Sequence, residues 1–292
     1  MCSSDLDANG QARPIEHALF WALMAVVAVS PLPLGSNRAW AWSALAVMVG
    51  LLLLVWAAGA ALGRVPVRIG WRVLAPGAVI FIGLELWYAV QASGITPASW
   101  DHWLWRPAAD ALQTRVDGAI SLSPDATMTG IMRFATYGGV FLLAVQFGRD
   151  AARARLMFWV PAAAGLAYAL YGLVLMFGRS NMILWFERWA YQGSLTSSFV
   201  NRNSYSTYAG LTLIAALALG SGSMGKSLEL GLRSRTGILH FIDNLQPKVF
   251  LLTVMMTVVA TALLLSRSRG ALIATILGFV AYFSMLGLRS RQ

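Results

Sequence analysis

Long apolar runs constrain the fold of this chain more than any other feature. A helix that crosses a membrane needs about 20 mainly apolar residues. Runs of this kind cover residues 17–35, 40–62, 73–93, 128–147, 156–177, 204–220, 249–265 and 270–288. Only helices and closed barrels satisfy their backbone polar groups in lipid, and these runs are too long for barrel strands. The sequence therefore predicts an all-α, polytopic transmembrane helix bundle of about eight spans.

The composition supports a membrane protein and argues against a soluble one. The chain is 58% hydrophobic and 12% charged, whereas soluble domains average about 45–50% and about 25%. In a soluble protein the net charge of +10 would favour nucleic acid as a partner. Here the positive-inside bias explains the charge, so membrane lipids are the expected partners and nucleic acid is not.

Cysteine and histidine chemistry contributes little to the expected function. The single cysteine, Cys2, excludes an intramolecular disulfide. Three histidines stand alone and make no metal-ligand spacing: His17, His102 and His240. We expect no metal and no cofactor.

The lysines and arginines set the expected orientation. Most of them, including both lysines, fall in segments that would be cytoplasmic if the N-terminus were inside. This bias predicts an N-in, C-in topology. The polar residues 1–16 are expected to form a disordered head before a transmembrane domain over residues 17–292. Residues 221–248 contain apolar residues at helical spacing and predict a short helix on the cytoplasmic interface.

Two stretches place arginines at helix mouths on the outer side. The first, Ser198–Gly210, reads SFVNRNSYSTYAG, and the second, Leu263–Leu272, reads LLLSRSRGAL. Arginine matches phosphate bidentately and stays charged, so Arg202 and Arg269 together could hold a pyrophosphate. The alternative is that both arginines reach lipid phosphates at the interface. Arg267 is a further candidate, but on a helix it would diverge from Arg269 by about 200°, so at most one of the two should face a shared site.

The other polar residues of the first stretch have two possible roles. Asn201 and Asn203 could position a ligand, or they could cap the following helix, which is the favoured role for Asn203. Tyr205 and Tyr208 fit an interfacial aromatic belt.

Glu85 and Arg133 form a possible buried pair. Counted from the outer ends of their consecutive helices, they lie roughly 12 Å and 8 Å deep. Their similar depths predict an ion pair that either lines a ligand-binding cavity or has a purely structural role.

The outer loop, residues 94–127, carries three tryptophans, which are expected to anchor it at the interface or to stack on a glycan: Trp100, Trp103 and Trp105. His102 is the only outer histidine and the only local general-base candidate of that type.

The two arginine stretches together resemble the O-antigen ligase/O-antigen polymerase family. SFVNRNSYSTYAGL is similar to the Phe-x-Asn-x-Asn-like motif that opens one helix in that family, and LLLSRSRGALIA is similar to its Ser-Arg-Gly motif. The resemblance covers residues 198–288, and the earlier helices match only in being apolar.

The resemblance implies a multi-pass glycosyltransferase of the bacterial inner membrane. Such proteins transfer a glycan from undecaprenyl pyrophosphate to lipid A-core, or to another glycan, at the periplasmic face. They contribute to lipopolysaccharide and cell-surface polysaccharide biosynthesis. Arg202 and Arg269 would be catalytic and would bind the donor pyrophosphate with Asn201, Asn203 and Arg267.

The chain also departs from the family pattern. Members continue into a large periplasmic loop that carries a histidine base, and no histidine follows His240 here. We therefore expect an N-terminal portion of a longer protein, without the complete catalytic apparatus. A ligase is the favoured interpretation of the function. An O-antigen polymerase, a secondary transporter and a non-catalytic membrane subunit are the alternatives.

Overall fold

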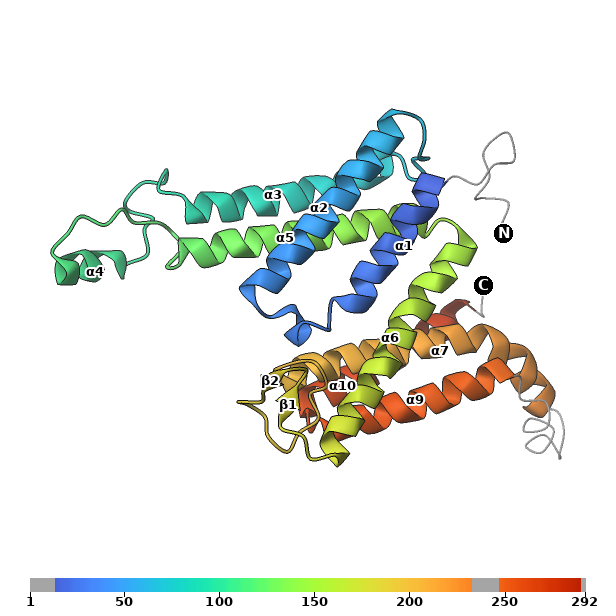
Figure 1. Ribbon diagram of the computed structural model, residues 1–292. Helices are drawn as coiled ribbons and strands as arrows, with labels where there is room; N and C mark the ends of the chain where they lie inside the picture. The colour runs from blue at the N-terminus through green and yellow to red at the C-terminus, as the bar shows by residue number, and fades with distance from the viewer. Residues whose placement is uncertain (1–13, 233–246, 290–292) are drawn as a thin grey trace. The chain divides into compact units, whose positions relative to one another are not determined.

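The computed structural model describes residues 14–232 and 247–289, and these residues are mostly helical (Figure 1). The elements in chain order are α1 (Pro14–Val29), the 3-10 helix η2 (Leu34–Ser36), α2 (Ala39–Ala61), α3 (Trp71–Ala92), α4 (Trp105–Leu112), α5 (Pro124–Phe147), α6 (Ala151–Phe177), β1 (Met182–Ile183), β2 (Phe186–Glu187), α7 (Arg202–Leu232), α9 (Pro247–Leu265) and α10 (Arg269–Arg289).

Every predicted apolar run contains a helix, and among the described residues six helices are long and apolar enough to cross a membrane: α2, α3, α5, α6, α9 and α10. The protein is thus a multi-pass helical membrane protein. At 16 residues, α1 is about 24 Å long, shorter than the roughly 30 Å hydrocarbon core. The count of eight spans and the N-in, C-in orientation stay predictions.

Several boundaries differ from the sequence prediction. α1 begins at Pro14, so the last residues of the expected disordered head are helical, and Glu16 within them is buried. α7 continues to Leu232, although the run was expected to end at residue 220. The apolar residues that predicted the interfacial helix, Ile238, Phe241, Ile242 and Leu245, lie outside the described residues.

The chain divides into two compact units, and no sequence signal predicted this division. The first comprises residues 1–23 and 42–149, and the second comprises residues 24–41 and 150–292. In the first unit α3 packs along α5, where Phe81 stacks on Phe134 with ring centroids 4.8 Å apart. The side chain of Gln146 holds the segment before α3, since its Oε1 accepts from the backbone nitrogens of Arg68 and Ile69.

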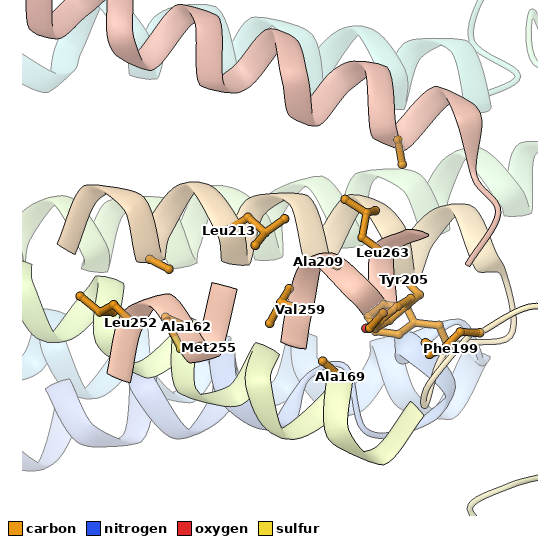
Figure 2. Close-up of a cluster of buried hydrophobic side chains, with 14 of the residues drawn as sticks. Ala162, Ala169, Phe199, Tyr205, Ala209, Leu213, Leu252, Met255, Val259 and Leu263 are labelled. Carbon is orange, nitrogen blue, oxygen red and sulfur yellow. The ribbon is translucent and has the colours of Figure 1, made fainter. Parts of the chain in front are cut away.

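α7 is the central helix of the second unit and packs against α6, α9 and α10. Figure 2 shows the buried side chains between these helices, among them Ala209, Leu213 and Val259. Small residues let the backbones approach closely, as is usual where helices associate in lipid. At Gly210 the approach is so tight that a Cβ would overlap Oγ1 of Thr275 on α10.

A partly buried loop closes one end of the second unit. Residues 178–201 connect α6 to α7 and include the antiparallel β1–β2 pair. The loop is fastened on both sides: the backbone nitrogen of Leu195 donates to the carbonyl of Leu265 (3.1 Å), and Ser197 Oγ donates to the carbonyl of Tyr168 (2.6 Å). It therefore lies beside the beginning of α7 and the end of α9.

Candidate functional site

The two arginine stretches meet at this end of the second unit. α9 and α10 are joined by a turn at residues 266–268, and α7 packs against both. Two side-chain contacts join the stretches. Ser206 Oγ lies 2.6 Å from Ser266 Oγ, and Ser268 Oγ donates to Asn203 Oδ1 over 2.9 Å. Ser206, Ser266 and Ser268 are all buried, so these contacts fix the beginning of α7 against the α9–α10 turn.

A pocket of about 670 Å³ lies at this junction. Its lining residues are Arg202, Asn203, Leu263, Leu264, Arg267, Ser268, Arg269 and Leu272. The structure therefore brings together Arg202 and Arg269, as well as Arg267 and Asn203, from the candidate set. The lining contains no aspartate or glutamate, so it combines positive charge with an apolar wall of leucines.

The structure corrects the expectation that at most one of Arg267 and Arg269 faces a shared site. Arg267 lies in the turn with φ of 57°, in the left-handed region, and α10 begins only at Arg269. The helical angle of about 200° between the two residues therefore does not apply. Both side chains line the pocket.

The capping role that the sequence favoured for Asn203 belongs to Asn201. Asn201 is the cap, because its Oδ1 accepts from the backbone nitrogen of Asn203 over 2.8 Å and α7 begins at Arg202. Asn203 lines the pocket and accepts from Ser268. Asn201 does not line the pocket, so only Asn203 can contact a ligand there directly.

Arg202 is the most enclosed of the three arginines. It is half-buried, whereas Arg267 and Arg269 are exposed. Its guanidinium carbon lies 5.4 Å from the centroid of the Tyr191 ring. Its Nε is buried and has no hydrogen-bond partner within the described ranges. In the same ranges none of the three arginines belongs to the ion pairs found, which are Arg68–Glu16 and Arg115–Asp117.

Glu85 and Arg133 do not form the predicted pair. The guanidinium of Arg133 lies 4.8 Å from the centroid of the Trp42 ring, and both carboxylate oxygens of Glu85 lack a hydrogen-bond partner among the described residues. Glu85 shares a helix face with Phe81 and Tyr88, and these rings contact Phe134 on α5. Similar depth in the membrane was not enough to predict the pair, because it does not determine which side of each helix faces the other helix. Both residues belong to the first unit, and the arginine pocket belongs to the second.

The outer-loop candidates belong to the first unit as well. His102 Nδ1 accepts from the backbone nitrogen of Leu104 (3.3 Å), and its ring stacks on Trp103. Trp100 and Trp103 are exposed. The aromatic-belt prediction for Tyr205 is wrong, because this ring is buried in the core against Phe199 (Figure 2).

Sequence reasoning missed Tyr191 and the serines that join the two stretches. The alternation of serine and arginine in Ser266–Arg267–Ser268 was a usable signal, because a turn can point alternate side chains to opposite sides. Nothing in the sequence indicated Tyr191, which contacts Arg202 only through the folding of the loop.

Among the described residues no group of histidine, cysteine, aspartate or glutamate side chains could hold a metal ion. Comparisons with known protein families, curated proteins and solved structures gave no match for this chain. The resemblance to the O-antigen ligase family stays a prediction that rests on the two short motifs.

Proposed function

We propose that this protein is a glycosyltransferase of the O-antigen ligase type, which takes a glycan from undecaprenyl pyrophosphate at the periplasmic face of the bacterial inner membrane and transfers it to lipid A-core. The observation that carries the proposal is the shared pocket of Arg202, Arg267 and Arg269. Three cations around one cavity repel one another, and a dianionic group between them turns that repulsion into attraction. Guanidinium groups also match phosphate oxygens bidentately.

The rest of the lining fits an amphipathic donor. Leu263, Leu264 and Leu272 supply an apolar wall next to the cations. A prenyl chain would contact this wall while its diphosphate contacts the arginines. Such a pocket favours transfer because the negative charge on the diphosphate grows as the bond to the sugar breaks, and preorganised cations stabilise that charge.

The pocket lining does not include the acceptor's base. Arginine stays protonated at any relevant pH, and asparagine, serine and leucine do not take a proton at neutrality. The proposed roles of these residues are therefore donor binding and stabilisation of the leaving group.

The test compares Arg202→Ala and Arg269→Ala with wild type in cells that depend on the full protein for glycan transfer. Loss of one preorganised cation should lower transfer by about 100-fold or more, while the protein still inserts in the membrane. Arg179→Ala is the matched control, because it removes an exposed arginine from the loop after α6, outside the pocket.

Near-wild-type transfer in both pocket variants would reject the proposal. The product separates ligase from polymerase: a ligase loads lipid A-core, whereas a polymerase lengthens the glycan on its lipid carrier.

A further inference from the structure

The loop beside the pocket exposes aromatic rings that the proposed donor site does not use. In the segment that follows α6, the exposed fractions are 71% for Trp185, 53% for Trp189 and 37% for Tyr191. Exposed aromatic rings at the membrane–water interface commonly serve as interfacial anchors. Two observations assign a more specific role to Tyr191.

The first observation is that the segment is rigidly held. Leu184 donates its backbone N–H to the hydroxyl of Tyr171 (2.8 Å), and β1 pairs with β2. Arg188 is only 8% exposed, and its Nη1 donates to the carbonyl of Ser194 (3.1 Å). Burial lowers the pKa of the Arg188 guanidinium from its ordinary value. The loop thus buries a charge inside itself while it leaves apolar rings outside, which indicates that the positions of the rings are specified.

The second observation is that two of the rings contact cations. The guanidinium of Arg202 lies 5.4 Å from the centroid of Tyr191, and that of Arg38 lies 4.9 Å from the centroid of Trp189. Tyr191 therefore adjoins the pocket through Arg202, which lines it. Both rings keep exposed surface beyond these contacts.

We propose that Tyr191 stacks on the pyranose ring that is attached to the diphosphate held by Arg202. This inference rests on the proposed function and assigns the sugar-recognising residue of the same site. A pyranose has an apolar C–H face and a polar rim, so an aromatic ring buries the C–H face while the hydroxyls stay hydrated. In a glycosyl diphosphate the first sugar is bonded to the phosphate. Tyr191 correspondingly lies next to Arg202, the residue proposed to hold that phosphate.

The test measures binding of two probes to the purified chain in detergent micelles by calorimetry. One probe is farnesyl pyrophosphate, and the other is the same lipid with N-acetylglucosamine on the diphosphate. The wild type should bind the sugar-bearing probe more tightly. Tyr191→Ala should lose about fivefold in affinity for that probe, from the usual strength of an aromatic stacking contact. Its affinity for farnesyl pyrophosphate should change less than twofold.

Three further variants sharpen the comparison. Tyr191→Phe keeps the ring and should retain the affinity for both probes. Trp189→Ala removes an exposed ring that contacts Arg38, outside the pocket lining, and should leave both affinities unchanged. Trp185→Ala is the matched control, because this exposed ring lies in the same loop with no cation contact among the described residues, and it should leave both affinities unchanged. Elution by size exclusion confirms that each variant is folded.

Three outcomes would overturn the inference alone. Equal losses for both probes in Tyr191→Ala would mean that the ring acts only by positioning Arg202. Unchanged affinities would mean that it is only an interfacial anchor. If the wild type binds neither probe, the proposed function fails and the inference fails with it. If the wild type binds farnesyl pyrophosphate but gains nothing from the sugar, the inference fails and donor binding stands.

Discussion

The close approach of α7 and α10 at Gly210 predicts a measurable energetic coupling to Thr275. Both helices begin with a pocket arginine, so their separation also sets the spacing of Arg202 and Arg269. Thr275 is 5% exposed, and its Oγ1 donates to the carbonyl of Ala271 over 2.7 Å. The hydroxyl therefore cannot rotate away from an added methyl group without losing this hydrogen bond.

Opposing contributions set the magnitude of the expected change in stability. Gly210→Ala adds a methyl group that overlaps Thr275, and overpacking of this kind costs about 1–3 kcal/mol. The better helix propensity of alanine offsets about 1 kcal/mol of this. The single variant should therefore lose about 1 kcal/mol of stability. Thr275→Ala loses its hydrogen bond, about 1 kcal/mol, but removes the overlap. The double variant should return near wild type, which gives a coupling of about 2 kcal/mol.

The assay is unfolding in mixed micelles with increasing dodecyl sulfate, followed by tryptophan fluorescence, on the four members of the cycle. Gly83→Ala is the matched control, because a Cβ at this helical glycine meets no atom within 4 Å, and it should not destabilise. Additive effects of the two substitutions, within about 0.5 kcal/mol, would refute the close approach.

Another prediction concerns the first unit, where Arg68 Nη2 lies 2.6 Å from the buried carboxylate of Glu16. Arg68→Met should cost about 3 kcal/mol, because the carboxylate loses this partner while it stays buried, and Arg68→Met combined with Glu16→Gln should recover most of the loss in the same unfolding assay. A loss that the second substitution does not recover would mean that packing, and not charge, explains it. At the pocket, Ser268→Ala removes the donor to Asn203, and pyrophosphate binding measured by calorimetry should weaken by about threefold to tenfold. Unchanged binding would show that this contact does not position the pocket.

The membrane character of the protein could be predicted from single residues and their spacing. Each apolar run contains a helix, because apolar side chains and unsatisfied backbone groups admit no other solution in lipid. The ends were predicted less well: Glu16 was placed outside a helix, yet it is helical, and α7 continues from Ser221 to Leu232, beyond residue 220 where the run was expected to end. These helix ends consist largely of polar residues, so they lie outside the apolar runs used for prediction. A helix nevertheless continues wherever its backbone hydrogen bonds and packing allow.

The site residues divide in the same way. Arg202 and Arg269 could be selected from sequence because cations at a helix mouth are conspicuous in an apolar chain. The roles of Asn201, Asn203 and Arg267 depended on backbone geometry, above all on the left-handed conformation at Arg267. The Glu85–Arg133 pairing failed because depth along a helix does not fix rotation about its axis.

The sequence by itself determined that this chain is helical, lies in a membrane and carries its notable cations in two short stretches, because these properties follow from hydrophobicity and charge that each residue brings with it. Only the tertiary structure decided that the two stretches form one pocket, that serine side chains join them, and that Tyr191 packs against Arg202. Such contacts join residues about 10 to 65 positions apart in the chain, and their geometry comes from helix packing, which no local pattern specifies.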